Sequence, residues 1–285
     1  SAGSRWRGRG TLRSGTSPWT ILVMFVGIVV WITILNSRFI EPTSLMTFGR
    51  KAAPLVILAA GQYLVMVAGE LDLSVGSLVG AQVVIAARVM DGDGSLTLQV
   101  MLLMLAVGLL VGLVNGLVTT LLKVPSFIVT LGMMMVLYGA VRWWTGGAPT
   151  GSLPDNFRTF GRGGISWEPV RQISWAMLIA IAVAIIGAVL MRTSFGRTLI
   201  ALGDNQKAAH YSGVRVTRTK IIAFVLSSVS ATIAAVLIGG FAGVTSQVGE
   251  GLEFQVITAV VLGGVALTGG RGHILAAMCG ALTLE

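Results

Sequence analysis

Two carboxylates, Glu70 and Asp72, stand close together between two long apolar segments of the chain. They belong to the stretch GELDLSVGS, residues 69–77, which also carries Ser74. A turn that caps the next helix needs only one such group, either the Ser74 hydroxyl or the Asp72 carboxylate. The other acid is left over, and acidic groups beside apolar spans are costly unless they are paired or hydrated. Two interpretations stay open, a structural turn and a functional, re-entrant turn near a pathway or a partner face.

Single polar side chains also interrupt other apolar segments, among them Gln62, Gln82, Asn115 and Thr130. Buried amides and hydroxyls in a helical membrane protein usually bond to neighbouring helices, so packing is favoured over ligand binding at each of them. The candidate residues for a translocation path or a structured turn are Glu70, Asp72, Ser74, Asn115, Phe127 and Thr130.

A basic loop, residues 192–220, contains the third unusual pattern. From Asn205 to Tyr211 the composition predicts a short amphipathic helix with Asp204 or Asn205 as its N-cap and Gly213 near its C-terminus. Small side chains leave one face of this helix bare, which favours docking into a groove of a partner over a solvated loop. The candidate docking residues are Gly203, Asp204, Asn205, Ala208, Ala209, Ser212 and Gly213.

Patterns for catalysis, metal binding or nucleotide binding are missing from the sequence. The glycine-rich stretch 269–272 suits a tight turn between close-packed helices, and the GxxxxGK[ST] pattern of a phosphate-binding loop does not occur. Cys279 is the only cysteine, and the two histidines, His210 and His273, are far apart with no nucleophile near either in the sequence. We therefore expect no enzyme, no metal site and no cofactor in this chain.

The composition identifies the elements that must position these residues. Hydrophobic residues make up 54% of the 285 residues and charged residues 11%, against roughly 25% charged in an average soluble domain. A soluble globular protein and a disordered chain are excluded, and an all-α, polytopic transmembrane bundle remains. Nine apolar segments are present: 19–36, 45–69, 74–90, 96–122, 127–144, 173–191, 221–243, 254–267 and 273–285.

The distribution of charge predicts the orientation of the bundle. Six lysines and arginines gather in the loop 192–220, and four arginines precede the first apolar segment. The positive-inside rule then predicts a basic cytoplasmic tail at 1–18, a membrane domain at 19–285 and an extracytoplasmic loop at 146–172. The tail and first segment also permit a signal peptide, although the apolar run is long and no cleavage pattern follows. Anionic lipid explains the net charge of +9 without nucleic acid.

Five motifs in order resemble bacterial ATP-binding-cassette permeases for monosaccharides, of the ribose, xylose, arabinose, galactose and autoinducer-2 type. The similarity covers about residues 20 to 285, and the five motifs together are specific although no single one is. They are GELDLSVGS at 69–77, NG at 115–116 with VPSFIVTLG at 124–132, FGR at 195–197, ALGDNQKAAHYSGV at 201–214 and AVVLGGVALTGGRG at 259–272.

The resemblance implies about ten spans, a multi-pass location in the bacterial inner membrane and a helix at 203–213 that docks on an ATPase. It also implies a second permease subunit in a homodimer or heterodimer, two ATP-binding-cassette subunits that hold ATP and Mg²⁺, and an extracytoplasmic sugar-binding protein. The chain departs from many relatives at Glu70 and Asp204, where they carry glycine. The alternative function is an ion-coupled secondary transporter that uses Glu70 and Asp72.

Overall fold

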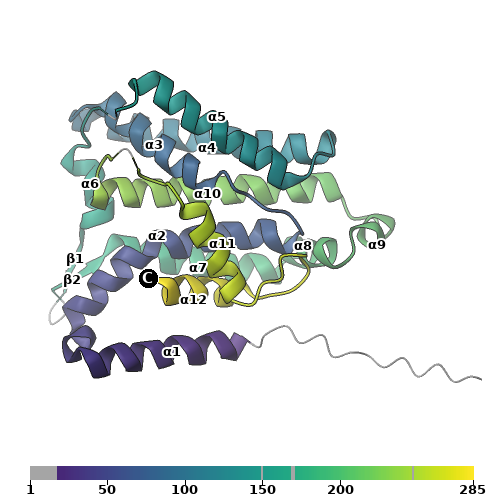
Figure 1. Cartoon of the computed structure of the whole chain (residues 1–285), viewed down its shortest axis with the longest axis horizontal. Coiled ribbons are helices and arrows are strands. Elements are labelled where there is room, and N and C mark those ends of the chain that lie inside the picture. The colour runs from purple at the N-terminus through teal and green to yellow at the C-terminus, as the bar shows by residue number, and fades with distance from the viewer. Residues whose placement is uncertain (1–17, 149, 168–170, 246) are drawn as a thin grey trace, which may run out of the picture.

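The computed structural model describes residues 18–148, 150–167, 171–245 and 247–285, so the predicted basic tail lies almost wholly outside the described residues. The described chain is a bundle of helices (Figure 1). The helices are α1 (Pro18–Leu35), α2 (Pro42–Val67), α3 (Val75–Met90), α4 (Thr97–Leu121), α5 (Ser126–Thr145), α6 (Asp155–Arg162), α7 (Trp175–Arg192), α8 (Ser194–Asp204), α9 (Gln206–Tyr211), α10 (Val216–Ala242), α11 (Leu252–Leu262) and α12 (Ile274–Leu284), with short 3-10 helices at Ser37–Ile40 and Gly94–Leu96.

Nine of these helices coincide with the nine predicted apolar segments. Five of them, α2, α4, α5, α7 and α10, are long and apolar enough to cross a membrane. The apolar helices α1, α3, α11 and α12 are shorter. Since α11 has 11 residues, it is about 16 Å long, roughly half of a 30 Å hydrocarbon core. The structure agrees with a helical membrane bundle, while nine to ten crossings and an inside N-terminus stay predictions.

The polar segments are more structured than the sequence suggested. The predicted outer loop folds into α6 and a hairpin of β1 (Gly164–Trp167) and β2 (Arg171–Ser174), in which Ile165 pairs with Ile173. The bundle is helical as predicted, and this short hairpin is a local exception whose strands carry β-branched and aromatic residues, which favour strand over helix. We call the end of the bundle with these strands the hairpin end. The opposite end carries α8 and α9, and we call it the α9 end (Figure 1).

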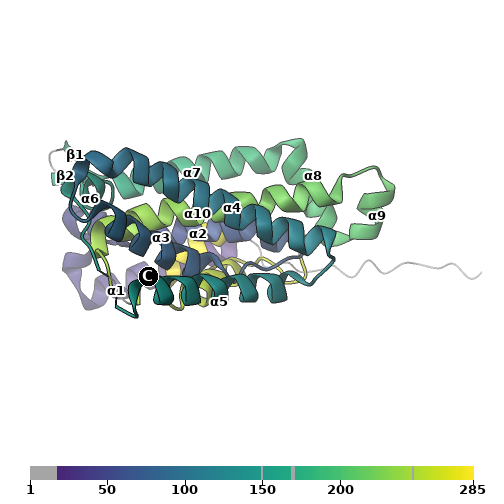
Figure 2. The ribbon, with the colours of Figure 1, turned by 90° about the horizontal axis from the view of Figure 1, so that it is seen from above.

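Two helices, α2 and α10, form the centre of the bundle. They run side by side between α1 and α5 in Figure 1, and in Figure 2 α4 crosses in front of α10 while α7 runs along the upper edge of the bundle. In an apolar stretch of 18 residues within α2, 89% of the residues are buried, whereas in such a stretch of α5 only 11% are buried. The core therefore lies around α2 and α10, and α5 keeps a broad outer face free of contacts from the described chain.

A glycine stripe on α4 lets α10 approach closely. Gly108, Gly112 and Gly116 recur every four residues on one face, and a Cβ on Gly112 would lie 2.7 Å from Val225 Cα. A Cβ on Gly116 would lie 2.8 Å from Ile221 Cα. Because real side chains never come so near a backbone atom, the two helices pack at this distance only with glycine on α4.

We expect Gly112→Ala to destabilise the protein by about 1–3 kcal/mol, because the new methyl group forces α4 and α10 apart. The matched control is Gly132→Ala on α5, where a Cβ meets nothing within 4 Å. Alanine has the better helix propensity by roughly 1 kcal/mol, so the control should be neutral or slightly stabilising. Thermal unfolding of the purified protein measures both changes. Equal melting temperatures for the two variants would contradict the close packing.

Candidate functional site

The segment between α2 and α3 is an extended turn held by side chains of α5. Backbone N–H groups in such a segment have no helical partner and must be satisfied from elsewhere. The N–H of Leu71 donates to Ser126 Oγ at 3.0 Å, and the N–H of Leu73 donates to Thr130 Oγ1 at 3.1 Å. Thr130 is fully buried, so its predicted role at this turn is structural: it fixes the backbone on both sides of Asp72.

Asp72 lies at the centre of a buried hydrogen-bond network. Its side chain has no solvent exposure. Oδ1 accepts hydrogen bonds from the Ser74 N–H at 3.0 Å and from Ser74 Oγ at 2.6 Å. Oδ2 accepts one from Ser227 Oγ, on α10, at 3.0 Å. Three donors from two parts of the chain therefore stabilise the carboxylate without a cation.

Asn115 extends this network to α4. Its Nδ2 donates to Ser74 Oγ at 2.9 Å, and the whole side chain is buried. Its Oδ1 has no hydrogen-bond partner among the described residues. The row Asn115–Ser74–Asp72–Ser227 thus ties α4, the start of α3 and α10 to one turn.

The expected cap by the Ser74 hydroxyl is not present. Ser74 occupies the N-cap position of α3, but its side chain forms no capping hydrogen bond. The Ser74 hydroxyl instead donates to Asp72 and accepts from Asn115, because a buried carboxylate is the stronger acceptor. Asp72, the other expected cap, accepts a hydrogen bond from the N–H of Ser74, the N-cap residue itself, and not from an N–H of the first turn of α3.

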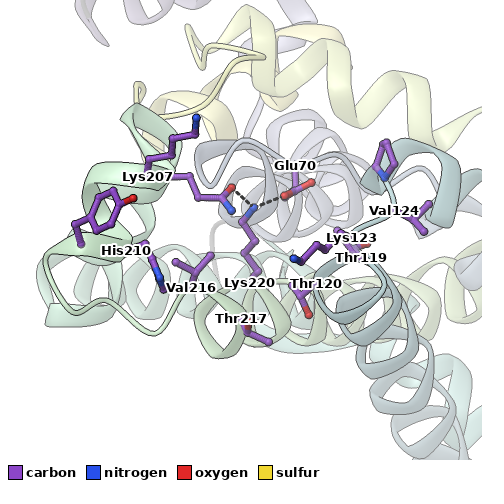
Figure 3. A pocket seen from close by; sticks show the side chains of 13 residues that line it. Glu70, Thr119, Thr120, Lys123, Val124, Lys207, His210, Val216, Thr217 and Lys220 are labelled. Atoms are coloured by element: carbon purple, nitrogen blue, oxygen red, sulfur yellow. Dashed lines mark hydrogen bonds and ion pairs between the residues drawn. The ribbon is translucent and has the colours of Figure 1, made fainter.

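Glu70 is paired with Lys220, which lies near the start of α10. Figure 3 shows the Lys220 ammonium between the Glu70 carboxylate and a glutamine of α9. The exposed fractions of the two side chains are 7% for Lys220 and 14% for Glu70, and Lys220 Nζ donates to Gln206 Oε1 at 2.7 Å. One ammonium group therefore joins α9, α10 and the turn.

This ion pair borders an open pocket of about 670 Å³ at the α9 end (Figure 3). Its walls come from α9, from the start of α10 and from the loop between α4 and α5. The lining residues are Glu70, Thr119, Thr120, Lys123, Val124, Pro125, Gln206, Lys207, His210, Tyr211, Val216, Thr217 and Lys220.

Glycines from three distant motifs meet beside the turn. A Cβ on Gly269 would lie 2.7 Å from the Gly69 nitrogen and 2.9 Å from the Gly203 Cα, and Gly69 and Gly269 both have positive φ. The Gly270 N–H donates to the Val67 carbonyl at 2.8 Å, which satisfies the end of α2. The glycine-rich stretch is therefore a tight packing turn, one of the two predicted alternatives.

The short helix predicted from Asn205 to Tyr211 is confirmed as α9. Asn205 is its N-cap, since its side chain accepts from the Ala208 N–H at 3.0 Å, while Asp204 ends α8. Gly213 follows with φ +82°. Ala208 and Ser212 are exposed, whereas Ala209 is buried and packs inward, so the outer face of α9 excludes Ala209.

The structure brings five of the six predicted path or turn residues together and leaves Phe127 apart, half exposed on α5. Sequence reasoning missed Ser126, Gln206, Lys220 and Ser227. Lys220 counted as a loop charge, although α10 already begins at Val216. Among the described residues, no three His, Cys, Asp or Glu side chains group as metal ligands.

We expect Ser227→Ala to lower the free energy of unfolding by about 1.5–3 kcal/mol, because Asp72 loses a hydrogen bond to a charged acceptor. Ser230→Ala is the matched control one turn along the same helix. The Ser230 hydroxyl bonds only to the Leu226 carbonyl of its own helix at 3.0 Å, so its loss should be nearly neutral. Denaturation of both purified variants gives the difference, and equal stabilities would rule out a stabilising role of the Asp72 network.

Comparisons with known proteins identify the kind of molecule that carries this site. A family model described as "Branched-chain amino acid transport system / permease component" matches residues 44–285. The chain is 36% identical over 267 residues to the autoinducer 2 import system permease protein LsrC of Enterobacter sp. (strain 638), covering 93% of this chain and 75% of that protein. It is 36% identical over 265 residues to the ribose import permease protein RbsC of Bacillus subtilis (strain 168), covering 90% of this chain and 79% of that protein.

LsrC of Photorhabdus laumondii is 32% identical over 266 residues, covering 93% of this chain and 78% of that protein. No solved structure matches the chain. The chain therefore belongs to this family of transport-system permease components, and the predicted resemblance to ATP-binding-cassette permeases for monosaccharides is confirmed.

Proposed function

We propose that this permease component forms the membrane path of an ATP-driven importer for a monosaccharide or a related small polar solute. The observation that carries the proposal is the direct link from α9 through Lys220 to the turn of Glu70, within a chain of the permease family. Relatives named for ribose and autoinducer 2 import support the solute class. As a permease component the chain is not an enzyme, and ATP and Mg²⁺ belong to a separate subunit.

The proposed topology places the α9 end in the cytoplasm of a bacterial cell and the hairpin end outside, in an inner-membrane bundle of nine to ten spans. The cluster of basic residues in the segment 192–220 supports this orientation. Two ATP-binding subunits dock at the α9 end, with the exposed face of α9 as coupling helix. A sugar-binding protein docks at the hairpin end, and a second permease subunit, identical or homologous, packs on the membrane-embedded surface.

The proposed mechanism is alternating access driven by movement of α9. When the ATPases close, they shift α9, and Gln206 transmits the shift to Lys220 and Glu70. The turn of Asp72 then moves relative to α4 and α10, which its network joins. Discrete switching of such packed elements produces outward-open and inward-open states.

Ion-coupled transport is the weaker alternative for this chain. It requires a carboxylate that gains and loses a proton or cation during transport. The Asp72 side chain is hydrogen-bonded by two serines, and Glu70 is ion-paired with Lys220, so neither carboxylate is free to bind a transported proton or cation. The family is also one of ATP-binding-cassette permeases.

Proteoliposomes that contain the permease with its ATPase subunits and binding protein test the proposal. We expect ATP-dependent uptake of at least one neutral monosaccharide from a panel of D-ribose, D-xylose and D-galactose. A hydrolysis-dead ATPase should abolish this uptake. Uptake that persists with the dead ATPase and follows a proton gradient would establish the alternative.

We expect Lys220→Met to lower the number of solute molecules moved per ATP by about tenfold or more, because it leaves Glu70 unpaired beside α9. Lys123→Met is the control, since it removes the same charge from the same pocket without touching Glu70. Lys220→Met should also lower the stability of the protein, because Glu70 is left without its partner. The double variant Glu70→Gln with Lys220→Met should be more stable than Lys220→Met alone, but it should move as few solute molecules per ATP. Normal coupling in Lys220→Met would show that the ion pair transmits nothing.

A further inference from the structure

A second, smaller pocket lies between α3, α5 and the segment that leads into α11. Its volume is about 340 Å³, within the 300–1,000 Å³ range of small-molecule sites. It shares no lining residue with the pocket at the α9 end. Its lining residues are Val84, Tyr138, Val141, Arg142, Thr145, Gly147 and Glu250.

Three polar side chains of this pocket, those of Tyr138, Arg142 and Glu250, have no partners among the described residues. The side chains of Arg142 and Glu250 form no hydrogen bond or ion pair there, although both line the same cavity. The Tyr138 hydroxyl is buried and likewise lacks a hydrogen-bond partner. A buried hydroxyl without a partner is costly, so Tyr138 is suited to a ligand that supplies the missing bond, and the exposed side chains of Arg142 and Glu250 are free to bind the same ligand.

The charges in the pocket favour a neutral ligand over a singly charged one. Arg142 only donates hydrogen bonds, and an ionised Glu250 only accepts them. A neutral, polyhydroxylated solute can satisfy both, since each hydroxyl group donates and accepts. An anion is repelled by Glu250 and a cation by Arg142, so either charge loses on one side what it gains on the other. The aliphatic and aromatic walls from Val84, Val141 and Tyr138 suit the C–H faces of a sugar ring.

The pocket is adjacent to the turn network through Glu253. This residue begins α11, is 4% exposed, and its Oε2 has no hydrogen-bond partner among the described residues. Its carboxylate lies against Gly76, two residues beyond Ser74 of the Asp72 network. Unpartnered polar groups thus continue from the pocket toward the centre of the bundle, where a path for a polar solute needs them.

We propose that Tyr138, Arg142 and Glu250 form an entry subsite for a neutral sugar on the path of the importer. This inference rests on the proposed function and adds the residues that receive the solute from the binding protein. The subsite need not bind tightly, because a solute on a transport path must also leave it.

The test uses proteoliposomes of the full transporter and radiolabelled D-ribose, D-xylose and D-galactose, with the loaded binding protein varied in concentration. We expect Arg142→Gln, Glu250→Gln and Tyr138→Phe each to lower the maximal uptake rate roughly three- to tenfold, the effect of one or two lost hydrogen bonds. The KM for the loaded binding protein should stay unchanged, and Arg142→Lys should recover part of the rate. Arg38→Gln and Glu41→Gln, exposed residues outside the pocket, are the charge-matched controls and should transport like the unchanged protein.

Each result decides one question. Unchanged maximal rates in all three variants would overturn the subsite. A higher KM for the binding protein with an unchanged maximal rate would also overturn it, since the pocket would then belong to a docking surface. If the unchanged transporter takes up none of the three sugars with ATP, the proposed function fails before the variants are compared.

Discussion

The buried carboxylate of Asp72 is the constraint on which the arrangement of the bundle depends. A carboxyl group with no solvent exposure is tolerated only if hydrogen-bond partners surround it. Its donors come from the turn itself and from α10, and the bridging Ser74 is bonded in turn by α4. The carboxylate keeps its partners only if three features are correct together: the path of the extended turn, the position of the start of α3, and the rotation of α10 about its axis. A change in any one of them removes a hydrogen bond from Asp72.

Close approach of backbones is the second condition for this arrangement. Ser227 reaches Asp72 from a helix that packs against the glycine stripe of α4, where Gly112 permits contact with the backbone of α10. Beside the turn, Gly69 and Gly269 bring the end of α2 against the glycine-rich stretch before α12. Polar bonds specify the geometry, and the absence of side chains allows the distances that these bonds require.

Hydropathy predicted the nine apolar helices within a few residues, because an apolar run of sufficient length has few other structures open to it in a membrane. The side chains that bond to the turn could not be predicted from the sequence in this way. Ser227, Ser228, Ser230 and Thr232 look alike in the sequence of α10, and only the rotation of the packed helix selects Ser227 for Asp72. Lys220 was assigned to a loop since it is charged, yet its pairing with Glu70 allows it to stand buried on a helix. Such pairings are long-range, so no local pattern reveals them.

The two acids of the turn differ in what holds them, and this difference separates their roles. Asp72 is bonded by hydroxyl groups on packed elements, so it fixes the turn to the core. Glu70 is bonded by Lys220, which also holds Gln206 of the peripheral helix α9. Breaking a buried ion pair costs about 3–5 kcal/mol, more than the roughly 1 kcal/mol of an ordinary hydrogen bond. The ion pair is therefore the stronger of the two links, and the Gln206–Lys220 hydrogen bond is the one that limits how far a displacement of α9 could reach the turn that Asp72 anchors.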